Sequence, residues 1–562
     1  MTEQRTRDIL DAHWRETRTG LRRGWDLVVH RGPGQIRFWF IALGVGIAAG
    51  LAAVGFRLGI TLLQSTLYGT DDIRRIHTFA ETLPWWMILL IPVAGGLAVG
   101  FILTRFTPDD RVRSVADVIE GAALKDGRVE QRAGLASALA SMITLGSGGS
   151  SGREGPVVHL AAVISTWVSD RIGADGITGR DLLGCAVAAA VSASFNAPIA
   201  GALFALEVVL RHFAVHAFAP IVIASVAGTV IGRLSFGNVT EFSLPPQGAL
   251  SFYVELPAFM LLGLVCGLVA VAMMRAIFLA EDLASHTAKR AGLPPILRPA
   301  LSGALLGAIA IVFPHIIGVG YETTSAALTG QLGFREAVVF CAVKVVAVAI
   351  TIAGRMGGGV FSPSLMVGAL TGLAFGLLAV QVFPDVSGTG TLYALAGMGA
   401  VAAAVLGAPI STTLIVFELT GDWQTGLAVM VAVSLSTALA SRIVDRSLFL
   451  TQLERRGVHL AAGPQAYLLS LYSAAVIMRA KDSPRAAPED VCRSLMAQGV
   501  RIAPDATLEV AMPLFDKGGH AFIPVVGKGK GGAPELMGAV FQVDALKAYN
   551  RALAATAAEE HS

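Results

Sequence analysis

A Gly- and Ser-rich segment with one acidic residue carries the most distinctive chemistry in the sequence. It reads Leu145-Gly-Ser-Gly-Gly-Ser-Ser-Gly-Arg-Glu154-Gly-Pro156-Val-Val-His159. Proline fits the first turn of a helix, where its missing N–H is not needed, and the preceding glycines let backbone approach a ligand closely. Because free N–H groups at a helix N-terminus attract anions, the segment predicts an anion site. Glu154, an ionisable residue in an apolar region, is a functional candidate beside that site.

A second segment repeats this arrangement in the other half of the chain. It reads Gly357-Gly-Gly-Val360-Phe361-Ser-Pro363, and its proline follows Pro156 by 207 residues (363 minus 156). Two helix ends could converge on one ion without any full positive charge, and such divided attraction suits an ion that must also leave. The Glu154 carboxylate could itself occupy the anion site when ionised and vacate it when protonated.

Other polar residues nearby allow alternative interpretations. Gly149-Ser-Ser-Gly152 matches the Gly-x-Ser-Gly of rhomboid intramembrane proteases, with Ser151 as nucleophile and His159 as base. Only eight residues separate that pair, and a glycine-rich helix start explains the motif without chemistry, so we expect no enzyme. His159 is expected to be a hydrogen-bonded packing residue. Lys344 could serve equally in a structural pairing or in conduction.

The composition requires elements that cross a membrane. The 562 residues are 54% hydrophobic and 15% charged, outside the range of soluble globular domains. Full crossings are predicted for stretches of about 20 or more apolar residues, at 38–63, 86–104, 251–279 and 425–443. Shorter segments broken by Gly or Pro suit backbone that faces protein or a wet cavity. These lie around 133–145, 155–168, 184–194, 198–210 and 408–419.

An internal repeat organises these segments. Asn196-Ala-Pro-Ile-Ala-Gly-Ala-Leu-Phe-Ala-Leu-Glu207 aligns with Gly407-Ala-Pro-Ile-Ser-Thr-Thr-Leu-Ile-Val-Phe-Glu418 at an offset of 211 (418 minus 207). The fold class predicted is therefore an all-α polytopic membrane domain of two inverted repeats, about 38–233 and 251–449. Glu207 and Glu418 are expected to be structural, capping or pairing with backbone.

The ends of the chain are predicted to be cytosolic. Residues 1–37 form an Arg-rich N-terminal segment, which the positive-inside rule places in the cytoplasm. We expect both termini on the cytoplasmic side of a cell inner membrane. Residues 458–562 read as a small cytosolic α/β tail, and the order helix, strand, turn, strand, helix at about 500–552 resembles one CBS unit. Whether that unit binds nucleotide, pairs across a dimer or serves as a spacer stays open. A net charge of +3 implies no nucleic acid, and the four cysteines show no metal-ligand spacing.

Taken together, the motifs resemble the CLC family of chloride channels and chloride/proton exchangers. The resemblance covers about 38–457 and rests on Gly152-Arg-Glu-Gly-Pro156, Gly358-Gly-Val-Phe-Ser-Pro363 and the two Ala-Pro-Ile helices. It implies a lipid-embedded homodimer with one pore in each subunit, chloride as the bound ion and no cofactor.

The resemblance also assigns roles to single residues. Glu154 would be the external gate. Arg153 beside it could supply positive potential to the pore or simply form an ion pair. The anion-binding positions it implies are Ser114, Gly155, the backbone amides of Val360 and Phe361, and Phe449. Here Ser114 lacks the glycines and proline of the family turn, and Phe449 replaces a tyrosine, so a hydroxyl donor is missing.

The position of the family's inner proton-carrying glutamate is occupied by Val208. A valine cannot relay protons, which favours an uncoupled channel. A chloride/proton antiporter that uses a different inner proton route is the alternative.

Overall fold

The structure is a computed structural model, and it describes most of the chain. The described residues are 32–70, 72–213, 215–237, 242, 252–384, 387, 389–458, 460, 469, 472–528 and 534–560. The Arg-rich start of the predicted N-terminal segment lies outside the described residues.

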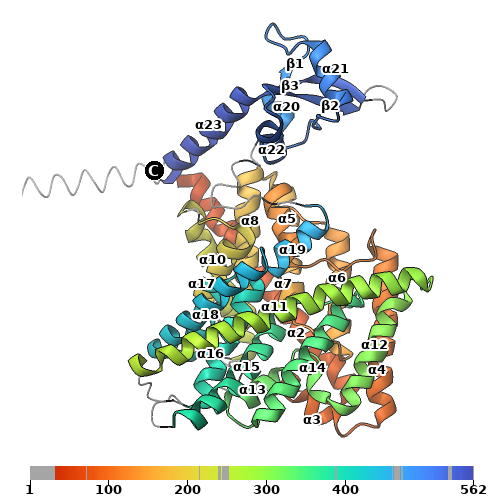
Figure 1. The fold of residues 1–562 in the computed structure, drawn as a ribbon, viewed down its shortest axis with the longest axis vertical. Helices are drawn as coiled ribbons and strands as arrows, with labels where there is room; N and C mark the ends of the chain where they lie inside the picture. Colours follow the sequence, from red (N-terminus) through yellow and green to blue (C-terminus); the bar gives the residue numbers. More distant parts are fainter. Residues whose placement is uncertain are drawn as a thin grey trace, which may run out of the picture.

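Helices make up the large domain, and its first half runs from α2 to α10 (Figure 1). The longer helices of this half are α2 (Gly32–Tyr68), α4 (Trp85–Phe106), α5 (Val115–Leu124), α6 (Gln131–Gly146), α7 (Glu154–Ile172), α8 (Gly176–Phe195) and α10 (Val215–Phe236). Short turns complete it: η1 (Ile73–Arg75), α3 (Ile76–Ala80), α9 (Pro198–Phe204) and the π-helical η2 (Ala205–Leu210).

The second half repeats this order of long and short helices. Its elements are α11 (Phe252–Arg290), α12 (Leu297–Val312), η3 (Pro314–Ile316), α13 (Tyr321–Leu328), α14 (Phe334–Ala353), α15 (Phe361–Val382), α16 (Gly390–Leu406), α17 (Pro409–Thr420), α18 (Trp423–Ile443) and α19 (Leu448–Arg455). Packing repeats as well, since α10 lies against α2 and α8 while α18 lies against α11 and α16.

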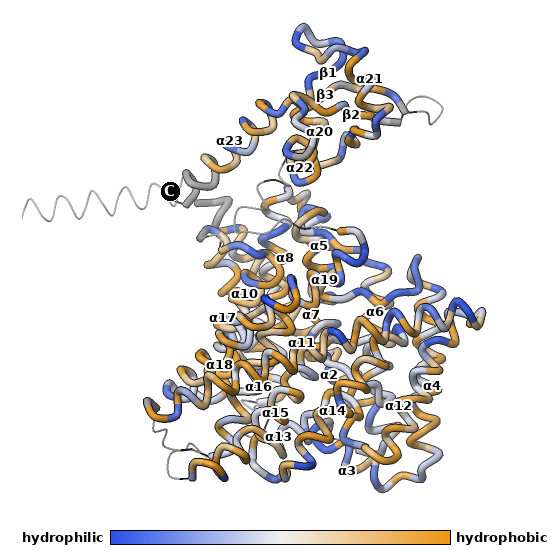
Figure 2. The backbone as a smooth tube through the Cα atoms, viewed as in Figure 1, coloured by the Kyte–Doolittle hydropathy of each residue, from blue (hydrophilic) through white to orange (hydrophobic). Residues whose placement is uncertain are grey.

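Apolar length supports several membrane crossings. Seven helices within the described ranges are long and apolar enough to cross a bilayer. The predicted stretches 38–63, 86–104 and 425–443 fall within α2, α4 and α18, and residues 252–279 of the fourth fall within α11, so the prediction of long apolar helices there is confirmed. Apolar residues dominate the large domain, whereas polar residues are more frequent in the small one (Figure 2).

Two carboxylates tie the halves together near the ends of α9 and α17. Glu207 accepts hydrogen bonds from the backbone N–H groups of Ile410 (2.9 Å) and Ser411 (2.8 Å) at the start of α17. Glu418 does the same for Ile199 (3.0 Å) and Ala200 (2.7 Å) at the start of α9. Each carboxylate satisfies N–H groups that a helix start leaves without intrahelical partners. The capping role expected for both residues is confirmed.

A small α/β domain follows the membrane helices. Its antiparallel sheet has the order β1 (Arg479–Ala480), β3 (Pro534–Phe541), β2 (Phe522–Lys528). The helices are α20 (Ala474–Ile477), α21 (Glu489–Ala497), α22 (Leu508–Gly518) and α23 (Gln542–Glu560). The predicted order helix, strand, turn, strand, helix is confirmed by α22, β2, β3 and α23. Its assignment as a CBS unit stays a prediction.

We predict that removing either capping carboxylate destabilises the junction of the halves. Glu207→Ala and Glu418→Ala should each lower the free energy of unfolding by about 2 kcal/mol, because two N–H groups at a helix start lose their charged acceptor. Thermal unfolding in detergent measures the effect. Glu489→Ala, which removes an exposed carboxylate from the small domain, is the control. Equal stability of all three variants would contradict the capping role.

Candidate functional site

One cavity brings the predicted anion-site residues together. It has a volume of about 420 Å³, and its lining includes Ser114, Glu154, Gly155, Val360, Phe361 and Phe449. These residues come from both halves of the chain, separated by up to 335 residues (449 minus 114). Of the other two predicted positions, Arg153 is buried behind Glu154, and Val208 is buried in η2; neither belongs to the cavity lining.

The two glycine-rich motifs meet edge to edge at this cavity. Gly152 and Gly359 form an antiparallel bridge, each N–H donating to the other's carbonyl at 2.7 Å. Gly358 has φ +131°, and a Cβ there would lie 2.0 Å from the Ser151 hydroxyl oxygen, so no side chain fits. The bridge sets the first turns of α7 and α15 beside the same cavity.

Glu154, the first residue of α7, is bound across the junction of the halves. It is 2% exposed, and its Oε1 accepts hydrogen bonds from the hydroxyls of Ser362 (2.5 Å) and Tyr321 (3.4 Å). The Arg153 guanidinium lies 3.9 Å from the same oxygen. Oε2 has no hydrogen-bond partner among the described residues. The carboxylate therefore sits at the wall of the cavity, held at one oxygen by donors from the second half.

Tyr321 was missed by the sequence analysis, and Ser362 was quoted within a motif without a role. The repeat contained a signal for Tyr321. Ser114 precedes the first residue of α5, and Gly320 precedes the first residue of α13 at an offset of 206 (320 minus 114). When the repeat is extended to these two short helices, Tyr321 falls at the helix start equivalent to that of α5.

A family model and curated relatives identify the family of this chain. The family model described as voltage gated chloride channel matches residues 95–441. This chain belongs to that family, the CLC family. A putative chloride channel protein, ClcB-like, from Ralstonia nicotianae is 32% identical over 393 residues, covering 69% of this chain and 90% of its own. The voltage-gated ClC-type chloride channel ClcB of Escherichia coli is 30% identical over 433 residues, covering 74% and 98%.

Solved structures share the fold. A slow cyanobacterial Cl⁻/H⁺ antiporter superposes with a TM-score of 0.67 at 22% identity, covering 75% of this chain and 98% of its own. A eukaryotic CLC transporter gives a TM-score of 0.65 at 18% identity, covering 91% and 98%. The CLC family consists of channels and transporters, so the chain is not an enzyme.

Ser114 is positioned in this CLC chain by an acid rather than by glycines and a proline. It precedes α5, and both its N–H (2.7 Å) and its hydroxyl (3.2 Å) donate to Asp117 Oδ2. Asp117 is in turn held by Arg111 (2.7 Å) and Arg456 (3.2 Å). Burial raises the pKa of Asp117, but hydrogen bonding and charge from Arg111 outweigh that effect and leave the pKa well below its usual range.

Arginines surround the mouth of the cavity. Those among its lining residues are Arg111, Arg298, Arg355, Arg455 and Arg456, and the acids at the same mouth are Glu281 and Asp282. Much of this charge is paired, since Arg455 bonds Asp282 and both Arg111 and Arg456 bond Asp117. Arg298 and Arg355 donate to the backbone carbonyls of Ala353 and of Asp109 and Asp110. The excess of positive charge raises the local concentration of anions.

Phe449 lies in the first turn of α19 and is 5% exposed. Its ring lines the cavity at the place where the family resemblance puts a tyrosine. An aromatic wall is retained there while the hydroxyl donor is lost.

The remaining polar candidates have structural surroundings. The Ser151 hydroxyl donates to the Gly357 carbonyl (3.2 Å) and so joins the two motifs. Lys344 donates to the carbonyls of Ile316 (3.2 Å) and Gly318 (3.0 Å). Of the two roles considered for Lys344, these bonds match the structural pairing. His159 is buried, as expected of a packing residue, and its ring lies beside the backbone of Ser114.

We predict that Asp117 stabilises the Ser114 turn only while it is ionised. Asp117→Asn should lower the free energy of unfolding at pH 7 by about 3 kcal/mol, because Arg111 and Arg456 lose a buried partner. Since the pKa of Asp117 is lower in the folded than in the unfolded chain, its stabilisation is present above about pH 4 and is lost as the pH falls further.

Unfolding temperatures between pH 3 and pH 8 measure this difference. Asp110→Asn is the control, because Asp110 has φ +51°, which asparagine also tolerates. A difference between Asp117→Asn and wild type that is the same at pH 3 and pH 7 would contradict the prediction.

Proposed function

We propose that the protein transports chloride across the membrane through this cavity, with the Glu154 side chain as the gate. The observation that carries the proposal is the position of the Glu154 carboxylate, which lies in the cavity wall where α7 and α15 begin. Hydroxyl donors from Ser362 and Tyr321 bind it there. An anion site is thus filled by an anion of the protein itself.

Protonation of Glu154 would open this site. Hydrogen bonds to a charged group contribute about 1.5–3 kcal/mol, and a neutral acid loses most of that advantage. Chloride could then take the vacated position and bind the hydroxyls and backbone N–H groups that served the carboxylate. The Arg-rich mouth would supply chloride from solution without holding it at the centre of the pore.

We favour chloride transport that is not coupled to proton movement. Val208 lies in η2, is 5% exposed in the apolar core of the domain, and has no group that binds a proton. A named relative is a chloride channel, and a similar solved structure is a Cl⁻/H⁺ antiporter.

Chloride/proton exchange is the second candidate function. Glu281 of α11 lines the same cavity as Glu154. It offers a carboxylate on the pathway, although the inner glutamate of the family is replaced by Val208. Proton coupling through Glu281 is the alternative inner route.

Purified protein in liposomes tests both forms of transport. We expect chloride efflux down an imposed gradient without proton uptake, and faster efflux when the outside is acidified. Glu154→Gln should conduct with no such pH dependence, because the amide cannot ionise. Uphill proton movement that Glu281→Gln abolishes would establish exchange instead. An absence of anion flux would refute chloride transport.

The same assay tests how the gate is held. Ser362→Ala removes the shorter of the two hydrogen bonds to Glu154, so efflux at neutral pH should rise about tenfold, as expected for a loss near 1.5 kcal/mol. Ser364→Ala is the matched control on the same helix, since its hydroxyl donates to the Val360 carbonyl. Equal rates for the two variants would contradict the role of Ser362.

We also infer that two copies associate through α9 and α17. Ile199 and Ile410 are 56% and 48% exposed there, directly beside the half-buried carboxylates of Glu418 and Glu207. Charged carboxylates facing lipid are costly, so protein rather than lipid should cover this face.

Single-molecule photobleaching in liposomes measures the number of subunits. Wild type should bleach in two steps, and the bulky Ile199→Trp/Ile410→Trp variant should shift the population to one step. Leu301→Trp, on the exposed surface of α12, is the control. One-step bleaching of wild type would refute the dimer.

A further inference from the structure

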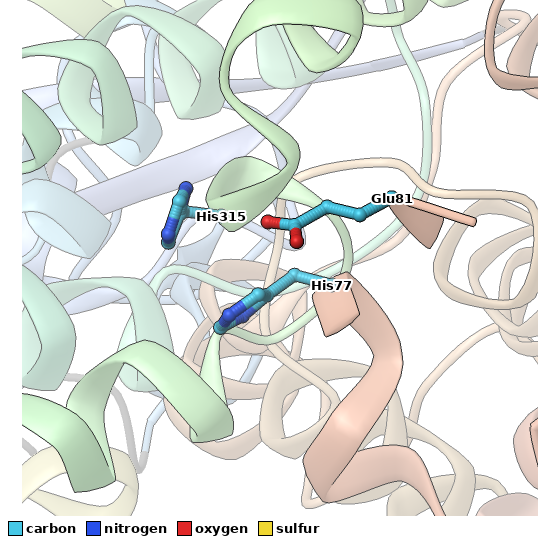
Figure 3. Close-up of side chains that lie close together, drawn as sticks. All are labelled: His77, Glu81 and His315. Carbon is cyan, nitrogen blue, oxygen red and sulfur yellow. The ribbon is translucent and has the colours of Figure 1, made fainter. Parts of the chain in front are cut away.

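We propose that His77, Glu81 and His315 bind a divalent transition metal of the Zn²⁺ class on the face of the membrane domain opposite the small domain. The three side chains converge on one point (Figure 3), and one ligand atom from each lies within 4.8 Å of the other two. α3 lies far from the small domain (Figure 1), and η3 packs against α3.

Local structure brings these residues together. His77 lies in α3 and Glu81 is the residue that ends it, so a spacing of four places both on one side of a helical turn. His315 comes from η3 in the second half of the chain. The cluster therefore spans the two halves, and none of its three residues lines the anion cavity.

A neighbouring carboxylate orients His77. Its Nδ1 lies 3.1 Å from Glu322 Oε2, and the backbone N–H groups of His77 and Thr78 donate to the same oxygen at 3.1 and 3.3 Å. A carboxylate that engages one imidazole nitrogen fixes the ring and leaves the other nitrogen for a metal. Glu322 would thus hold His77 in the form that binds metal through Nε2.

Ring stacking fixes His315. Its ring lies 3.9 Å from that of Phe340 at an interplanar angle of 25°, and 4.5 Å from that of His77. Its Nδ1 is buried and has no hydrogen-bond partner among the residues that the structure describes.

The donor set selects the metal. Two imidazoles and one carboxylate match Zn²⁺ and neighbouring transition metals, whereas Ca²⁺ and Mg²⁺ prefer oxygen ligands alone. Tetrahedral ligands at Zn²⁺ are about 3.4 Å apart, so the side chains need to close by about 1 Å. Glu81 is exposed, which lets an ion reach the cluster from solvent.

Metal binding would act on the gate, a consequence that rests on the proposed function. Glu322, which holds His77, follows Tyr321 at the start of α13, and Tyr321 donates to Glu154. The loop from η3 to α13 also carries the carbonyls of Ile316 and Gly318 that bind Lys344. An ion between α3 and η3 would fix this segment and keep Tyr321 on the Glu154 carboxylate, so transport should slow.

Calorimetric titration of the full chain in detergent with ZnCl₂, after removal of metal with EDTA, tests the site itself. We expect one ion per chain. His315→Gln and Glu81→Gln should each weaken binding about tenfold or more, since a ligand is lost. His286→Gln, an exposed histidine on α11, should bind as wild type does. No binding by wild type, or equal affinity in His315→Gln, would overturn the site.

Chloride efflux from liposomes then tests the regulation. Saturating Zn²⁺ should slow wild type and His286→Gln about fivefold, a typical coupling between sites, and leave His315→Gln unaffected. Binding without an effect on efflux would refute the coupling while the site stands. If the metal-free protein moved no chloride, the proposed function would fail, and the titration would still decide the site.

Discussion

The pairing of the two glycine-rich motifs is the constraint on which the rest of the structure depends. A two-residue bridge joins Gly152 to Gly359, and it needs backbone contact so close that Gly358 tolerates no side chain. Because the bridge fixes both loops, α7 and α15 start beside one cavity. Without that fixed pair of helix starts, the Glu154 carboxylate would have no common site with donors from the other half.

Away from the cavity, each half of the chain also caps a helix start of the other half. Glu207 caps α17, and Glu418 caps α9, so each half completes the helix start of the other. The same exchange occurs at the cavity, where Glu154 of the first half is bound by Ser362 and Tyr321 of the second. Polar groups inside a membrane must find partners within the protein, and here they find them across the repeat.

Charge at the cavity is graded in a way that suits a permeating anion. Arginines stand at the mouth, whereas hydroxyls and helix starts line the interior near Glu154. Full charges attract ions from solution, and partial charges bind them weakly enough for release. Where the family turn around Ser114 is lost, Asp117 and two arginines perform its positioning role instead.

The sequence by itself determined the membrane class, the repeat and the long apolar helices, because apolar length and helix-start motifs are local properties of a chain. That Ser114, Glu154, Val360, Phe361 and Phe449 share one site was implied by the family resemblance, and the cavity lining brings them together. Only the tertiary structure decided which side chains bind one another. Tyr321 on Glu154, Glu322 on His77 and the cluster with His315 join residues 167 to 245 positions apart, and no local pattern encodes such contacts.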